Sequence, residues 1–319
     1  MPGELDRWAA ERISQLTARA EAEVVAELKQ ALLRAAAAPV REAPSHAPRA
    51  AEPATTPSPA SAGHGLWAYC VARDDPGLTD GGAGLHPDGD LEWVRAGGLA
   101  VLCSRVPLNE FGEVPLQRNL NDLSWLERVA RTHEAAIEAA LAQVTVVPLG
   151  LCTIFADEDG ARRMLHERSA VLDAALVALD GREEWSVKLL VDRERLESSL
   201  RESGEPDRDP GSGAAYMLLR REERRLREAV DRLAADLAHD VHARLQERAV
   251  DARVRPPQNR ELSGHQGEMV LNGAYLVERD QADGLRELVA ELEQHHLQIG
   301  AQLELGGPFP PYSFVPEHE

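Results

Sequence analysis

The residues of this 319-residue chain best suited to chemistry are its histidines, and two pairs of them stand close together in sequence. His239 and His242 are three positions apart on an expected helix, a spacing that can place two imidazoles on one metal ion. No cysteine or third histidine stands nearby to complete a ligand set, so solvated helix residues are the better interpretation. His295 and His296 stand at an expected helix C-terminus, where the helix dipole favours cationic side chains. Neither pair predicts a metal site.

His133 differs from these pairs because it falls on the apolar stripe of an expected helix. A histidine in that position is either a core residue bonded to a backbone carbonyl or a catalytic base. The core histidine is the favoured interpretation, and the base stays open as an alternative.

The other residues that could carry chemistry also lack partners close by in the sequence. The run Gly81-Gly82-Ala83-Gly84 does not join a strand directly to a helix, so it lacks the context of a phosphate-binding loop. Cys70, Cys103 and Cys152 lie far apart in apolar segments and are expected to be buried, reduced thiols. No nucleophile stands beside a base. These residues favour a binding or assembly protein over an enzyme, with no cofactor and no metal.

Net charge and hydropathy disfavour two classes of partner, nucleic acids and membranes. The chain has 54 acidic and 35 basic residues, a net charge of −19, which disfavours binding to nucleic acid. The longest apolar-rich run, residues 144–156, contains Pro148 and is too short to span a bilayer. No signal peptide is recognised at the start of the sequence. We therefore expect a cytoplasmic protein that does not act on membranes.

Composition divides the chain into four segments. Residues 1–38 carry an apolar stripe at helical spacing and are expected to form an amphipathic helix. Residues 39–64 are rich in proline and alanine and are expected to be a disordered linker. Residues 65–181 are expected to form an N-terminal α+β domain, and residues 182–319 a second α+β domain that ends in a proline- and aromatic-rich tail.

The N-terminal domain is expected to begin with strands. The Gly97-Gly98 pair between two of them indicates a hairpin turn, and Asn119, Asn121 and Asp122 offer caps for a long helix. The expected elements are strands 66–72, 91–94 and 99–106, a helix that ends near Leu141, a strand 145–155 and a helix 157–179.

The second domain has a different order of strands and helices from the first. Its expected elements are a strand at 185–191, a helix at 214–246, strands at 250–254 and 269–277, a helix at 281–296 and a strand at 299–305. This βαββαβ order predicts a ferredoxin-like fold.

The tail, residues 306–314, contains three prolines and three aromatic residues. Proline lacks a backbone donor, so this run is expected to be neither helix nor central strand. We expect it to fold back onto the strand at 299–305, either as a packing strap or as a recognition surface that presents Phe309, Tyr312 and Phe314 on a stiff backbone.

Four separated motifs, in order, carry a resemblance to a known family: Asn119-Leu-Asn-Asp-Leu-Ser-Trp-Leu-Glu-Arg-Val-Ala-Arg-Thr-His-Glu134, Val144-Thr-Val-Val-Pro-Leu-Gly-Leu-Cys-Thr153, Glu184-Trp-Ser-Val-Lys188 and Gly307-Pro-Phe-Pro-Pro-Tyr-Ser-Phe314. Over roughly residues 65–315 the chain resembles the gas vesicle GvpL/GvpF family. Two positions depart from the pattern: Gly150 stands where relatives often carry arginine, and Phe309 where tryptophan is usual.

The resemblance implies an accessory protein of gas vesicle formation, with two α+β domains and no catalysis. Its implied partners are the vesicle shell subunit and other vesicle proteins, and its implied location is the cytoplasm and the gas vesicle. Trp125, Phe309, Tyr312 and Phe314 are the candidate partner-binding residues. A small-molecule-binding regulator or a minor enzyme, with His133 lining a pocket, is the alternative.

Overall fold

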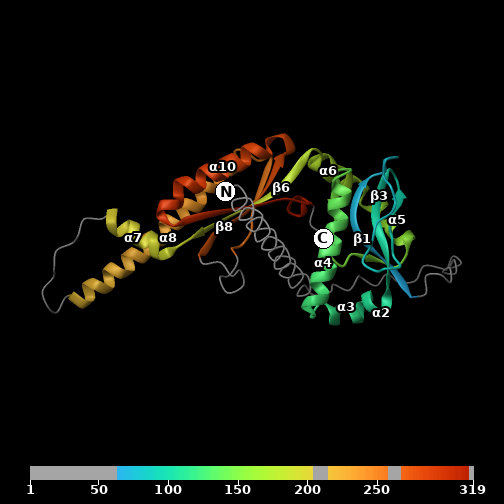
Figure 1. Ribbon diagram of the computed structural model, residues 1–319, viewed down its shortest axis with the longest axis horizontal. Helices are drawn as coiled ribbons and strands as arrows, with labels where there is room; N and C mark the ends of the chain where they lie inside the picture. Colours follow the sequence, from blue (N-terminus) through green and yellow to red (C-terminus); the bar gives the residue numbers. More distant parts are fainter. Residues whose placement is uncertain (1–62, 204–214, 258–266, 316–319) are drawn as a thin grey trace, which may run out of the picture. The chain divides into compact units, whose positions relative to one another are not determined.

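The computed structural model describes residues 63–203, 215–257 and 267–315 (Figure 1). The helix predicted at 1–38, and the linker predicted at 39–64 up to residue 62, lie outside the described residues. Backbone contacts group the rest into two compact units, one that ends at Asp180 and one that spans Gly181–Phe314. Each unit combines helices with an antiparallel sheet.

The first unit is built on a sheet in which β1 is central. Its strands are β1 (His64–Arg73), β2 (Leu91–Ala96), β3 (Leu99–Pro107), β4 (Val146–Pro148) and β5 (Ile154–Phe155). The order is β2-β3-β1-β4, and β5 also pairs with β1. Gly97 and Gly98 join β2 to β3 with φ of +62° and +81°, the left-handed conformation that a tight hairpin requires. The predicted hairpin is confirmed.

The helices of this unit are α2 (Leu108–Phe111), α3 (Glu113–Asn119), α4 (Leu123–Leu141), α5 (Glu158–Glu167) and α6 (Ser169–Leu179). The Asp122 carboxylate caps α4 by accepting the N–H groups of Ser124 and Trp125, at 3.0 and 3.3 Å. The apolar stripe of α4 is buried, as the sequence predicts.

Two predicted elements in this unit are wrong. The strand predicted at 145–155 is two short strands, because the chain leaves the sheet after Pro148 and turns through Cys152, whose φ is +69°. The helix predicted at 157–179 is divided at Arg168 into α5 and α6. The division lets α5 pack on β2 and β3 while α6 packs on β1 and β4.

The second unit comprises β6 (Arg182–Val191), α7 (Arg193–Ser203), α8 (Ala215–Gln246), β7 (Asp251–Val254), β8 (Glu268–Glu278), α10 (Ala282–His296) and β9 (Ala301–Phe309). Short 3-10 turns are η1 (Arg279–Gln281), η2 (Leu297–Ile299) and η3 (Tyr312–Phe314). The sheet order is β7-β8-β6-β9, with β6 and β8 central. Helix α7, which the sequence reading missed, begins where the Asp192 carboxylate accepts the N–H groups of Glu194 and Arg195.

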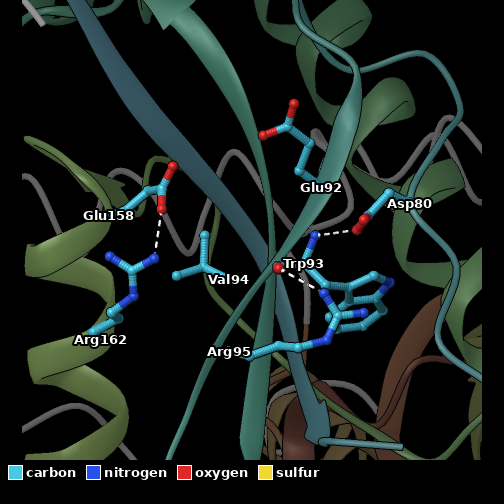
Figure 2. A pocket seen from close by; sticks show the side chains of 7 residues that line it. All are labelled: Asp80, Glu92, Trp93, Val94, Arg95, Glu158 and Arg162. Atoms are coloured by element: carbon cyan, nitrogen blue, oxygen red, sulfur yellow. Dashed lines mark hydrogen bonds and ion pairs between the residues drawn. The ribbon is translucent and has the colours of Figure 1, made fainter. Parts of the chain in front are cut away.

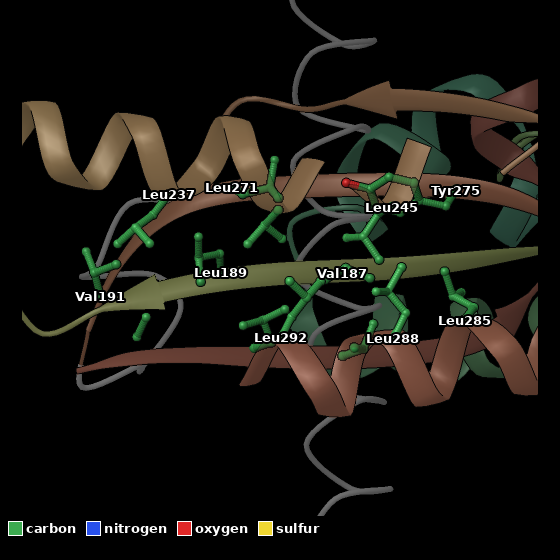
Figure 3. Packing of buried hydrophobic residues seen from close by; sticks show 14 of the residues in the cluster. Val187, Leu189, Val191, Leu237, Leu245, Leu271, Tyr275, Leu285, Leu288 and Leu292 are labelled. Carbon is green, nitrogen blue, oxygen red and sulfur yellow. The ribbon is translucent and has the colours of Figure 1, made fainter. Parts of the chain in front are cut away.

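The core of this unit lies between one face of the sheet and its helices (Figure 3). Alternate residues of β6 pack against α8 and α10. The buried side chains include Trp185, Val187, Leu189, Val191, Leu237, Leu245, Leu285, Leu288 and Leu292. Because side chains alternate along a strand, Glu184, Ser186 and Lys188 point to the opposite face, which we call the second face.

Candidate functional site

The tail does not fold back onto the strand predicted at 299–305 but first extends it. Strand β9 continues to Phe309, which pairs with Glu184 across a bulge in the β6–β9 ladder. Gly307 makes the bulge possible: its φ is +125°, and a Cβ there would lie 3.0 Å from the Glu184 carbonyl oxygen and 3.1 Å from the Trp185 ring. The glycine is therefore required for both conformation and space.

Glu184 then holds the tail. Its side chain is 4% exposed and accepts the Ser313 N–H at 2.8 Å, the Ser313 hydroxyl, and the Arg255 guanidinium at 3.1 Å. Arg255 also donates to the Ser313 hydroxyl oxygen. Charge-assisted hydrogen bonds of this kind are stronger than neutral ones. We call these three residues the Glu184 latch.

The latch places the tail on the second face of the sheet. After Phe309 on β9, the chain reaches Ser313 at the Glu184 carboxylate of β6 and then Phe314, whose ring lies 5.5 Å from the Arg253 guanidinium of β7. It thus crosses from one edge strand of the sheet to the other. The prediction that this run contains no helix is wrong at η3, because a 3-10 turn needs only the N–H of Phe314, bonded to the Pro311 carbonyl.

The candidate partner-binding residues are not equally accessible. Phe314 and Trp125 are buried, while Phe309 and Tyr312 are half-buried. The indole N–H of Trp125 donates to the Glu110 carboxylate at 2.7 Å, which the Arg128 guanidinium also contacts at 3.2 Å. Phe309, Tyr312 and Phe314 are brought together in the tail of the second unit, whereas Trp125 belongs to the first.

His133 is a core histidine bonded to a backbone carbonyl, as predicted. Its Nδ1 accepts the Trp67 indole N–H at 2.9 Å, so its Nε2 carries the proton and donates to the Leu149 carbonyl at 3.1 Å. Burial lowers the pKa of His133 to about 4. With 1% of its surface exposed and the Tyr69 ring stacked 5.3 Å away, the imidazole lines no pocket for a ligand.

A charged hollow of about 430 Å³ lies instead on the outer side of β2 (Figure 2). Its lining residues are Asp80, Glu92, Trp93, Val94, Arg95, Glu158 and Arg162. The charges largely bind one another or the backbone. Asp80 accepts the Trp93 N–H at 2.7 Å, Arg95 donates to the Trp93 carbonyl at 3.2 Å, and Arg162 pairs with Glu158 at 2.6 Å.

The bonds from Asp80 and Arg95 satisfy the backbone groups of Trp93 on the edge of β2 that faces away from β3. Leu91 also exchanges backbone hydrogen bonds with Gly81 and Gly82, at 2.8 and 3.1 Å. A strand whose outer groups are already bonded cannot pair with another chain. This pairing was not predicted, because nothing in the composition links the run at 81–84 to β2.

The remaining candidates for metal binding, within the described part of the chain, are the other histidines and the cysteines. No group of three or more histidine, cysteine or acidic residues within 63–203, 215–257 and 267–315 is placed to hold a metal ion. His242 contacts the Tyr275 hydroxyl at 2.9 Å. Cys70 and Cys103 are buried free thiols as predicted, whereas Cys152 is only half-buried. None of the helices in the described part combines the length and apolar character needed to cross a bilayer.

Known proteins are similar to this chain in sequence and in fold. The family model described as "Gas vesicle synthesis protein GvpL/GvpF" matches residues 65–316. Gas vesicle protein L of Streptomyces sp. (strain CB03234) is 35% identical over 249 residues, which cover 78% of this chain and 92% of the relative. Gas vesicle protein F of the same strain is 31% identical over 261 residues, 78% of this chain and 98% of the relative.

Solved structures agree at the level of the fold. The crystal structure of GvpF from Anabaena sp. PCC7120 superposes with a TM-score of 0.59 at 17% identity, covering 80% of this chain and 98% of that protein. GvpF from Microcystis aeruginosa gives 0.58 at 15% identity, covering 79% and 99%. Together with the match over residues 65–316, these findings show that the chain belongs to the gas vesicle GvpL/GvpF family.

Proposed function

We propose that this protein is an accessory factor of gas vesicle assembly, which binds the hydrophobic shell subunit and other vesicle proteins and nucleates or chaperones vesicle formation. Membership of the GvpL/GvpF family over residues 65–316 is the observation that carries the proposal. A shell that faces gas needs a subunit with an apolar surface, and such a surface aggregates when it is free in the cytoplasm. A partner that covers it solves this problem.

The chemistry of the chain supports a binding role without catalysis. His133, the histidine that is best placed to be a base, has both ring nitrogens bonded inside a packed core. A net charge of −19 favours solubility and opposes contact with nucleic acid and with anionic membrane surfaces. The proposed location is the cytoplasm and the growing vesicle.

For the fold, we infer two α+β domains at residues 65–181 and 182–319, preceded by an amphipathic helix at 1–38 and a linker at 39–64. The order β6–α8–β7–β8–α10–β9 and the sheet order β7-β8-β6-β9 support a ferredoxin-like classification of the second domain. Helix α7 is an addition to that pattern.

The outer edge of β9 is the proposed interface with the shell subunit. The edge of β2 is occupied by Asp80, Arg95 and the loop at 81–82, and β7 is only four residues long and carries Asp251 and Arg253. Strand β9 has nine residues and, within the described part of the chain, pairs with one strand, β6. An apolar strand of the subunit can extend the sheet there by backbone pairing.

The tail aromatics serve this interface in two ways. Phe314 is buried and holds the tail on the second face, whereas Phe309, at the end of β9, and Tyr312, which precedes the latch residue Ser313, are half-buried and offer accessible ring area. Aromatic side chains on a stiff backbone bind at low entropic cost. Trp125 remains a second proposed contact, through the first unit.

Deleting the gene and complementing it tests the proposed function. We expect the deletion strain to lose flotation, the full chain to restore it, and the shell subunit to co-purify with the tagged full chain. Phe309→Ala combined with Tyr312→Ala is expected to weaken co-purification, and because both rings are half-buried, thermal unfolding is measured alongside to show that the variant is still folded. Normal flotation of the deletion strain, in a background without a second family member, would refute the proposal.

A further inference from the structure

Three consecutive elements of the first unit, α2, α3 and the first turn of α4 (Figure 1), each carry an exposed apolar side chain. Leu108, Val114 and Leu123 are 38%, 70% and 59% exposed. Leu116 and Leu120 are half-buried between them in sequence. We call these five residues the α2–α4 patch.

Side-chain hydrogen bonds hold the three elements that carry the patch together. The Asn119 side chain donates to the Glu110 carbonyl at 3.0 Å, which ties α3 to α2. The Trp125 indole bonds the Glu110 carboxylate, which ties α4 to α2. Exposed apolar side chains that gather on neighbouring elements are typical of interaction sites.

The point where the described chain begins lies at this patch. The Leu108 N–H donates to the Gly63 carbonyl at 2.8 Å, and a Cβ on Gly65 would lie 3.2 Å from the Leu108 side chain. Whatever precedes residue 63 is therefore tethered beside the patch. That preceding chain consists of the proline- and alanine-rich residues 39–62 and the apolar stripe of residues 1–38.

We propose that the N-terminal segment, residues 1–38, docks as an amphipathic helix on the α2–α4 patch of its own chain. Its stripe includes Leu16, Val24 and Leu28 at helical spacing. If the 24 residues 39–62 behave as a flexible chain, they span about 30 Å on average, and more when proline extends them, so they are long enough to reach the adjacent patch. Such a tether gives an effective concentration in the millimolar range, so even weak contacts hold the segment in place.

Hydrogen–deuterium exchange of the full chain tests this proposal. If the intrinsic dissociation constant is about 0.1 mM, docking slows exchange in residues 1–38 by roughly tenfold. Val114→Glu combined with Leu123→Glu is expected to abolish that protection, because both carboxylates are placed on the apolar patch. Both positions lie in the first turn of a helix, where acidic residues are tolerated.

Val171→Glu is the matched control, because Val171 is also exposed (44%) and lies in the first turn of α6, outside the patch. It should leave protection unchanged. Exchange in β1, followed in the same samples, reports whether each variant is folded. The reciprocal variant changes the N-terminal segment. Leu16→Glu combined with Val24→Glu should speed exchange in residues 113–123, although every residue of the α2–α4 patch is unchanged.

Three results would each overturn the proposal. They are rapid exchange of residues 1–38 in the unmodified chain, protection that survives Val114→Glu with Leu123→Glu, and protection that falls on dilution. The last result would mean that the segment docks on a second copy instead of its own chain. Docking in cis is independent of dilution, so a concentration series separates the two.

Discussion

Replacing Glu184 by glutamine should release the tail from the second face of the sheet. The substitution keeps the size of the side chain but removes the charge that accepts from Arg255, from the Ser313 hydroxyl and from the Ser313 N–H. Hydrogen bonds to a charged group contribute about 1.5–3 kcal/mol each. Because the Arg255 side chain is 34% exposed, water replaces part of its interaction with Glu184 in the variant. We therefore expect the free energy of unfolding to fall by about 2–3 kcal/mol, less than the sum of the three hydrogen bonds.

The assay combines urea unfolding of the full chain with hydrogen exchange of residues 309–315. A local loss of about 2 kcal/mol raises the open population of the tail roughly thirtyfold, which exchange detects directly. The control is Glu278→Gln, because Glu278 pairs with Arg182 at 3.0 Å but is 42% exposed. An exposed pair contributes at most about 1 kcal/mol.

Equal unfolding free energies for the two variants, with unchanged exchange in the tail, would refute the latch. Ser313→Ala adds a second check. It removes the hydroxyl but keeps the N–H bond to Glu184, so it should cost less than Glu184→Gln.

Three further predictions follow from single residues. The pKa of His133 is about 4 when folded and about 6.5 when unfolded, so its contribution to stability is intact above pH 6.5 and is lost as the pH falls. We expect this contribution to fall by about 2 kcal/mol between pH 7.5 and pH 5, so urea unfolding at each pH should show a loss of stability that is about 2 kcal/mol smaller in His133→Gln than in the unmodified chain. Gly307→Ala should lower the free energy of unfolding by more than about 1 kcal/mol, because the position combines positive φ with close contacts; an unchanged midpoint would contradict this. Asp80→Ala should free the Trp93 N–H at the edge of β2 and increase aggregation, measured by light scattering; unchanged scattering would show that the edge is protected without Asp80.

Local patterns predicted the regular elements well. The 19-residue helix α4 has a continuous apolar stripe and an aspartate cap, so periodicity was sufficient to place it. The β2–β3 hairpin was equally clear because Gly97 and Gly98 separate two apolar strands. Both signals depend only on residues close together in sequence.

The missed features depend on tertiary contacts. Residues 144–156 are rich in apolar residues along their whole length, so the pattern does not mark where the chain leaves the sheet between β4 and β5. Helix α7 buries few apolar residues, chiefly Leu196, and its charged sequence gave no stripe to detect. These elements are decided by what they pack against.

The candidate site shows the same limit. The sequence identified Glu184 and the tail as parts of separate motifs, but their contact joins residues 129 positions apart. Nothing in the pattern of either motif predicts that pairing. The sequence left open whether the candidate aromatic residues pack or bind a partner, and the structure places Phe314 and Trp125 in packed surroundings.

Site-specific photo-crosslinking tests the binding of the shell subunit most directly. A benzophenone amino acid would be placed at Gln302, exposed on β9, and at Glu92, exposed on the occupied edge of β2, in the full chain co-expressed with the shell subunit. We predict a crosslink to the shell subunit from position 302 and little or none from position 92. Equal crosslinking from both positions would contradict the proposed edge, and no crosslink from either, with no co-purification of the subunit, would contradict the assembly role.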